Sequence, residues 1–215
     1  MRVVTIRNTK LLEALNEYSQ YVLANFNKIR KRDFELGSKG ISWKEVCSEE
    51  YLHKRMKLDP LDTAFPHHLY GIDSNMFEKR VVETLPDILE KNQILDDSIM
   101  NAIGIGFCAL KAIYPKEGYI DWHNNCNCPG QNLIMSYSTD GDGWFKYYDM
   151  HKKEIVTMHD KPGWTAKVGY YGEKSESDKI VWHCAKTTNP RITVSYVVRD
   201  QSMWEDMVYD IENDS

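Results

Sequence analysis

The stretch Ala112–Asn125, AIYPKEGYIDWHNN, carries a short run of alternating residues that ends at His123. A second histidine, His183, follows sixty positions later in Val181-Trp182-His183, and Arg191 begins another alternating run, RITVSYVV. Alternation over a few residues between turn residues is typical of β-strands. The two histidines are candidate metal ligands if the fold brings their strands together.

The sequence pattern changes from helical to strand-like near residue 103. Residues 1–102 are expected to be mainly helical and supporting, 103–199 to form the β core, and 200–215 to form a C-terminal helix and tail. With 215 residues, the chain is long enough for one sizeable core and does not require two. We therefore expect a single domain over 1–215.

Composition and charge limit the classes of partner that we expect for this protein. The net charge of −5 argues against nucleic acid, because phosphate binding favours a basic face. No apolar run approaches the roughly 20 residues of a membrane span, and MRVVTIRNTK lacks the apolar centre of a signal peptide. We expect a cytoplasmic protein that has no membrane partner and keeps its five cysteines reduced.

Helices are predicted before residue 103 and at the C-terminus. Asn8 or Thr9 caps the first helix, and a capping box of Ser42 with Glu45 starts the second. Ser74 caps the third, which Pro86 kinks or restarts. The predicted ranges are a strand at 1–6, helices at 9–32, 43–56, 75–93, 96–101 and 201–212, and a loop at 57–73.

Short alternating runs follow, separated by glycine, proline and acidic turn residues. The predicted strands are 107–114, 118–123, 131–138, 143–149, 154–159, 164–171, 179–183 and 191–199. Helices first and strands second give an α+β layout, with the helices packed on one face of a closed or double sheet. Strand alternation predicts that His123 shares a face with Asp121, and that Arg191, Thr193 and Ser195 share another.

Residues 104–199 resemble the 2-oxoglutarate/Fe(II) dioxygenase superfamily. The run Tyr114-Pro115…Gly118-Tyr119-Ile-Asp-Trp-His123 is similar to its prolyl hydroxylase branch, and Tyr137, His183 and Arg191 match later positions of that pattern. The resemblance covers just under half of the chain. Small phage-encoded members look closest overall, which would place the protein in a host cytoplasm.

The resemblance implies a double-stranded β-helix (jelly roll, cupin-like) with the N-terminal helices packed on one sheet. It implies catalytic roles for His123, His183 and Arg191, with Fe(II) on the two histidines, 2-oxoglutarate as cosubstrate and O₂ as oxidant. The far carboxylate of 2-oxoglutarate would meet Arg191, whose planar fork suits a carboxylate. Thr193, Tyr114 and Tyr137 would supply further cosubstrate contacts.

The chain departs from the family at the third metal ligand, because the expected His-x-Asp is His123-Asn124-Asn125. Three explanations are open: a two-histidine site with water in the third place, a carboxylate supplied by Asp121, or a halogenase-like site with chloride there. We therefore predict a hydroxylase that acts on a small molecule or a protein side chain. A halogenase or desaturase on the same fold, and a non-catalytic jelly-roll binding module, are the alternatives.

Overall fold

The computed structural model describes residues 1–75 and 79–214, with the backbone alone for 79 and 80. Part of the predicted third helix, residues 76–78, lies outside the described residues. The helices are α1 (Thr9–Asn25), α2 (Lys31–Glu35), α3 (Trp43–Val46), α4 (Glu49–Arg55), α5 (Lys79–Thr84), α6 (Ile88–Ile103) and α7 (Gln201–Glu212), with 3-10 turns η1 (Phe26–Lys28) and η2 (Pro60–Thr63). No helix within the described ranges is both long and apolar enough to cross a bilayer.

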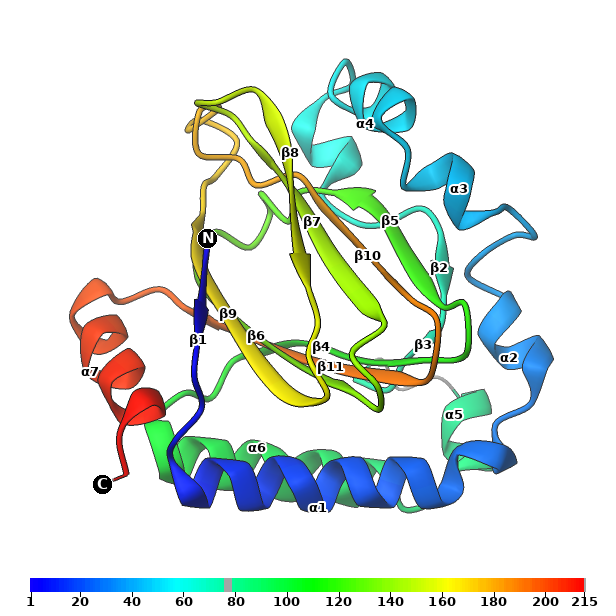
Figure 1. Cartoon of the computed structure of the whole chain (residues 1–215), viewed down its shortest axis with the longest axis vertical. Coiled ribbons are helices and arrows are strands. Elements are labelled where there is room, and N and C mark those ends of the chain that lie inside the picture. The colour runs from blue at the N-terminus through cyan, green and yellow to red at the C-terminus, as the bar shows by residue number, and fades with distance from the viewer. Residues whose placement is uncertain (76–78, 215) are drawn as a thin grey trace.

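The strands form two facing antiparallel sheets (Figure 1). They are β1 (Arg2–Val4), β2 (Leu69–Tyr70), β3 (Ile72–Asp73), β4 (Cys108–Tyr114), β5 (Tyr119–His123), β6 (Gly130–Ser138), β7 (Gly143–Asp149), β8 (Glu154–His159), β9 (Gly163–Tyr171), β10 (His183–Thr187) and β11 (Arg191–Val198). The larger sheet has the order β1-β9-β6-β11-β4-β3, and the smaller one β2-β5-β10-β7-β8.

Strand pairing within β4 to β11 is nested. The first strand of this set pairs with the last, β5 with β10, β6 with β9, and β7 with β8. A long hairpin wound into a double helix of strands has this order, so the fold is a double-stranded β-helix of the jelly-roll, cupin-like type in an α+β chain. The predicted fold class is confirmed.

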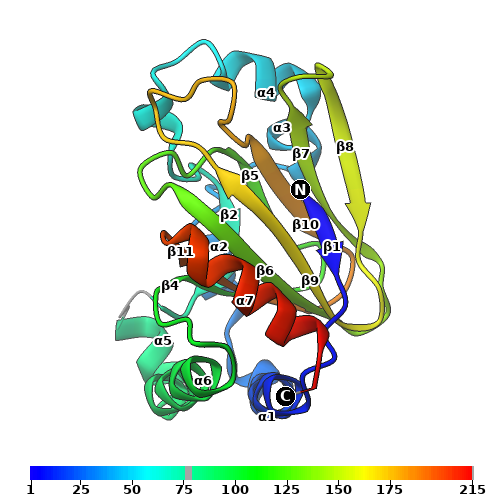
Figure 2. The same ribbon diagram turned by 90° about the vertical axis from the view of Figure 1, so that its left-hand side faces the viewer.

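The longest helices cover the outer face of the larger sheet. Figure 1 shows α1 and α6 side by side along that face, and Figure 2 shows both nearly end-on with α7 beside them. Their apolar stripes pack with Val4, Leu133, Val168, Ile192 and Val194 in the main core. The short α3 and α4 pack on β5 of the smaller sheet, where Val46 and Leu52 contact Trp122.

Alternation along β11 divides its residues between the core and the barrel interior. Ile192 and Val194 belong to the core under the helices, so Arg191, Thr193 and Ser195 point to the opposite face, toward the smaller sheet. The shared face predicted for these three residues is confirmed. Their burial in a closed barrel places polar groups where water has little access.

Several helices and strands have bounds that differ from the predicted ones. The seventh strand runs over 183–187 instead of 179–183, because Ile180 and Trp182 pack as loop residues against α3 and α4 without joining a ladder. The single helix predicted at 43–56 is interrupted at Ser48, whose hydroxyl caps α4. Ser42 accepts from the amide of Lys44, so it caps α3 without the predicted reciprocal box.

At the start of α1, Asn8 links the helix to α7. Its Oδ1 accepts from the amide of Leu11 at 2.9 Å, and its Nδ2 donates to the carbonyl of Asp210 at 3.1 Å. We expect Asn8→Ala to lower the free energy of unfolding by about 1–2 kcal/mol, since both a helix cap and a buried bond are lost. Urea denaturation would measure this, with Lys10→Ala as the exposed control. Equal stability of the two variants would contradict the assignment.

Candidate metal centre

The pairing of β5 with β10 places His123 directly opposite His183. Their ring centroids are 4.1 Å apart, and both side chains are almost fully buried at the end of the barrel interior. Phe145 stacks on His183 from the next strand, with centroids 5.5 Å apart, and Tyr171 meets the same ring edge-on at 5.1 Å. Two histidines that are distant in sequence thus share one aromatic-walled site.

Backbone carbonyls fix which nitrogen of each ring is free. His123 Nδ1 lies 2.7 Å from the carbonyl oxygen of Asp121, and His183 Nδ1 lies 2.9 Å from that of Val181. A carbonyl only accepts, so Nδ1 of each neutral ring carries the proton and Nε2 keeps its lone pair. The same arrangement orients metal-binding histidines in proteins. Both rings therefore present the atom and the tautomer that a metal ion requires.

Burial keeps the two imidazoles uncharged. It lowers the pKa of His183 to about 4, and it holds the pKa of His123 well below the ordinary 6.5, with a further contribution from repulsion by His183. Neutral imidazole is the form that binds metal. At neutral pH the pair is ready to bind without first losing protons.

Asp121 does not join the two histidines, which corrects the prediction from alternation. Between the pairs His183–His123 and Ala185–Ile120, β10 has one residue and β5 has two, Asp121 and Trp122, so β5 holds a bulge. The extra residue turns both Ile120 and His123 into the interior. Asp121 instead bonds to Tyr51 and to the backbone of the 57–73 loop.

Both carboxylate oxygens of Asp121 accept hydrogen bonds from residues away from the histidine pair. Tyr51 Oη donates to Oδ2 at 3.1 Å, and the amide of His67 donates to Oδ1 at 3.1 Å. Burial raises the pKa of Asp121 to about 7, against the opposing effects of Arg55 and these hydrogen bonds. Within the described residues, no group of three or more histidine, cysteine, aspartate or glutamate side chains is placed to hold a metal ion.

Asn125 is the side chain that lies beside the histidine pair. Its amide Nδ2 is 3.5 Å from His183 Nε2, and its backbone has a φ of +54°. Two backbone hydrogen bonds hold this turn: the backbone N–H of Asn125 donates to the carbonyl of Ala64, and the backbone carbonyl of Asn125 accepts from the N–H of Cys128. The 57–73 loop thus fixes the residue that replaces the expected aspartate.

A buried ionic cluster lies deeper in the barrel. Arg191 Nε is 2.8 Å from Asp160 Oδ2, and Lys167 Nζ is 2.9 Å from Asp160 Oδ1. Ser136 accepts from Arg191 at 2.9 Å. Burial opposes ionisation of Asp160, but the two cations outweigh it and keep the pKa of its carboxyl below the usual value. With two cations and one carboxylate, the cluster keeps an excess positive charge.

The residues predicted to contact the cosubstrate lie on both faces of the larger sheet, some inside the barrel and one against the helices. Thr193 Oγ1 is buried on the same face as Arg191 and has no hydrogen-bond partner among the described residues. The Tyr114 ring is also inside, with the Arg191 guanidinium 5.7 Å from its centroid. Tyr137 is on the other face, packed edge-on to Trp164 against the main core, so the prediction that it contacts the cosubstrate is wrong. It pairs with Ile192, which faces the helices.

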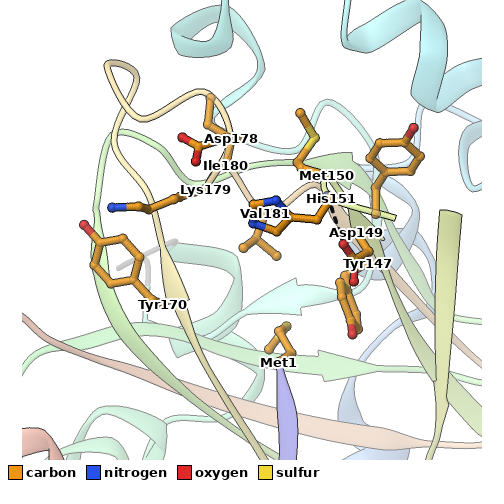
Figure 3. Close-up of a pocket in the computed structure, with 11 residues that line it drawn as sticks. Met1, Tyr147, Asp149, Met150, His151, Tyr170, Asp178, Lys179, Ile180 and Val181 are labelled. Carbon is orange, nitrogen blue, oxygen red and sulfur yellow. Dashed lines mark hydrogen bonds between the residues drawn. The ribbon is translucent and has the colours of Figure 1, made fainter. Parts of the chain in front are cut away.

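An open pocket of about 410 Å³ lies outside the barrel, and two of its lining residues are neighbours of His183. Tyr147, opposite His183 on β7, and Val181, which holds the His183 ring, line it and also pack on the barrel interior. Figure 3 shows Tyr170 and Lys179 on one side of this pocket, with Tyr147 on the other.

Asp160 and Lys167 were not among the sequence candidates. Lys167 could have been recognised, because Thr165, Lys167, Gly169 and Tyr171 alternate with the apolar Trp164, Ala166 and Val168 in one strand. A lysine on the inward face of a barrel strand predicts a buried partner. Asp160 carries no such signal, since its HDKPG context reads as an ordinary turn.

Comparisons with known proteins give similarity of fold at low identity. No family model matches the chain, and no curated protein matches it. A prolyl-4-hydroxylase from Pseudomonas putida is 15% identical, with a TM-score of 0.34 over 64% of this chain and 72% of that one. A prolyl hydroxylase from Trichoplax adhaerens, in complex with a hypoxia inducible factor peptide, is 12% identical, with a TM-score of 0.35 and 63% of each chain covered.

Proteins of other kinds also match. Peruvianin-I, a cysteine peptidase from Thevetia peruviana latex, is 11% identical, with a TM-score of 0.30 over 42% of this chain. This chain spans 50% of Peruvianin-I and 63% of the Trichoplax protein. Scores of this size carry no information about activity, and the fold rests on the strand order itself.

Asp160 balances two buried cations, so its removal should be costly. We expect Asp160→Asn to lower the free energy of unfolding by about 3 kcal/mol, because Arg191 and Lys167 would face each other without a counter-charge. Chemical denaturation would measure the loss. Asp142→Asn, at an exposed acid in the turn between β6 and β7, is the matched control. Equal stabilities would show that the cluster is solvated.

The depressed pKa values predict acid sensitivity of the metal-free protein. The unfolded chain binds protons at histidine near pH 6.5, whereas His183 binds one only near pH 4, so stability falls as the pH drops through this window. Its loss amounts to roughly 3 kcal/mol for His183. The difference between the urea midpoints at pH 7 and pH 4.5 should be smaller in His183→Gln than in the parent protein, and unchanged in the exposed-site control His151→Gln. An unchanged pH dependence in His183→Gln would contradict this.

Proposed function

We propose that the protein is an Fe(II)- and 2-oxoglutarate-dependent oxygenase, and most simply a hydroxylase. The observation that carries the proposal is the placement of two neutral, Nε2-free imidazoles at one end of a barrel whose interior also holds a net-positive cluster. A metal site and a buried anion site inside one barrel are what a metal-chelated dicarboxylate needs. Neither feature alone is uncommon, but together they restrict the chemistry.

The residues present fit a divalent iron ion. His123 and His183 would hold it through Nε2, and imidazole suits Fe(II). When bound, iron and 2-oxoglutarate together supply the activation of O₂ that oxidises a substrate, with 2-oxoglutarate converted to succinate and CO₂. The chain's own part is to fix both rings by their Nδ1 protons and to exclude water by means of Phe145 and Tyr171.

The cluster around Arg191 fits the far carboxylate of 2-oxoglutarate. Asp160 neutralises one of its two cations, and burial makes the remaining positive charge costly without an anion. Thr193 Oγ1, buried with no partner in the described part of the chain, would supply a hydroxyl on the same face. A carboxylate placed here would balance the excess positive charge and would accept a hydrogen bond from Thr193.

The cosubstrate would thus extend from the histidine pair into the barrel. Strand β10 runs from His183 toward the turn before Arg191, a length of roughly 13 Å at 3.3 Å per residue. The arginine side chain reaches back into this interval from β11. Substrate would approach from the other side, through the pocket lined by Tyr147 and Val181.

Arg191→Met tests the anion site. Anaerobic addition of Fe(II) and 2-oxoglutarate to the parent protein should give the weak visible charge-transfer band of the chelate. The variant should need roughly tenfold or more 2-oxoglutarate for the same band, because one buried charge-assisted hydrogen-bond pair is lost. Its Fe(II) binding should be unchanged.

Arg199→Met is the matched control, since Arg199 follows the same strand but is exposed. Its 2-oxoglutarate requirement should equal that of the parent. A parent protein that binds neither Fe(II) nor 2-oxoglutarate would contradict the proposal and favour a non-catalytic jelly-roll binding module. Retention of the band in Arg191→Met at parental concentrations would place the far carboxylate elsewhere.

A further inference from the structure

The open pocket outside the barrel has walls of aromatic rings and thioether side chains. Tyr147 and Tyr170 flank it on opposite sides (Figure 3), and Met1 and Met150 also line it. Its volume of about 410 Å³ is in the range of small-molecule sites. The face of a tyrosine ring attracts cations, and methionine packs against alkyl groups of irregular shape. These walls favour a ligand that joins a positive charge to apolar carbon.

The positive charge at this pocket is already neutralised. Of the described residues that line it, only Lys179 is a lysine or arginine. Its Nζ is 2.7 Å from Glu176 Oε1, and Tyr170 Oη donates to Glu176 Oε2 at 2.6 Å. The lysine and the glutamate cancel each other, and the glutamate also fixes the tyrosine ring at the pocket wall. Lys179 therefore has little charge left to attract an anion.

Two carboxylates of the pocket remain without a cation. Asp178 is exposed and forms no hydrogen bond or ion pair within the described residues. Asp149 Oδ1 accepts from the backbone amides two and three residues further on, both at 3.0 Å, and its Oδ2 is left free. Burial raises the pKa of the Tyr147 hydroxyl, and the negative charges of Asp149 and Glu154 raise it further. The pocket therefore has a negative potential that suits a cation.

This pocket and the barrel interior have opposite charge at opposite ends of β10. Tyr147 lies opposite His183, and the carbonyl of Val181 is 2.9 Å from His183 Nδ1, so the pocket adjoins the histidine end of the strand. The net-positive cluster of Arg191, Lys167 and Asp160 lies inside the barrel. A dianion is thus favoured inside and a cation outside, which would keep two different molecules at their own positions.

We propose that this pocket binds an aliphatic ammonium group, and that the group belongs to the molecule oxidised at the histidine pair. The first half stands on the pocket alone, and the second half rests on the proposed Fe(II) function. Tyr147 and Tyr170 supply ring faces to the cation, Asp149 and Asp178 supply negative charge, and Met1 and Met150 contact the alkyl chain.

Titration of the metal-free protein, labelled with ¹³C at the methionine methyl groups, tests the first half. Choline and n-butylammonium should shift the methyl signal of Met150, assigned through Met150→Leu, with Kd values on the order of millimolar. Met207, buried under the helices, is the internal reference and should not shift. Butanoate, and the neutral alcohol in which carbon replaces the choline nitrogen, should leave both signals unchanged. Work at pH 8 keeps imidazole side chains neutral.

Paired variants separate charge and ring from the fold. Asp178→Asn should weaken ammonium binding about threefold, and Asp206→Asn, at an exposed acid of α7, should not. Tyr170→Leu should weaken it by a similar factor, whereas Tyr170→Phe keeps the ring and should bind like the parent. Equal shifts with the neutral alcohol or with butanoate, or parental affinity in both Asp178→Asn and Tyr170→Leu, would overturn the inference.

Co(II) loading tests the second half without turnover. Saturating n-butylammonium should change the visible absorption of the Co(II)-loaded parent, because Tyr147 and Val181 contact both the pocket and the surroundings of His183. An unchanged spectrum in a protein that binds both Co(II) and ammonium would show that the pocket is separate from the metal centre. A parent that binds ammonium but neither Co(II) nor Fe(II) would overturn the proposed function instead.

Discussion

The antiparallel pairing of β5 with β10 is the constraint on which the candidate site depends. It sets His123 against His183, and the bulge within it turns His123 inward while leaving Asp121 to the 57–73 loop. The carbonyls of Asp121 and Val181 then fix both rings in one tautomer. A one-residue shift of this ladder would turn an imidazole out of the barrel, since strand faces alternate. Backbone register therefore controls the chemistry of the site.

Much of the fold was predictable because its signals are local. Alternation predicts β4 to β9 and β11 of the barrel, and the C-terminal helix has its predicted bounds, 201–212. Local signals failed where tertiary packing decides. Ile180 and Trp182 look like strand residues, yet they pack as a loop under α3 and α4, so β10 begins at His183 instead of ending there. Ser48 ended a helix that periodicity would have continued.

The site was predictable in part. The histidine pair and Arg191 follow from spacing and resemblance, and the structure brings the two histidines together. A bulge cannot be read from alternation, which is why Asp121 was misplaced. Tyr137 was misplaced because a motif match does not state which face a residue takes. Asp160 became visible only when folding put it between Arg191 and Lys167, and it makes the anion site a balanced cluster instead of a lone arginine.

The most direct measurement is an anaerobic crystal structure with Mn(II) in place of iron and with 2-oxoglutarate. The account predicts metal density on Nε2 of both His123 and His183, with the dicarboxylate chelating the metal and reaching toward Arg191 and Thr193. Metal bound at another place, such as Cys126 and Cys128, would contradict it. So would a cavity in which the histidine pair stays metal-free while the cluster around Arg191 remains without an anion.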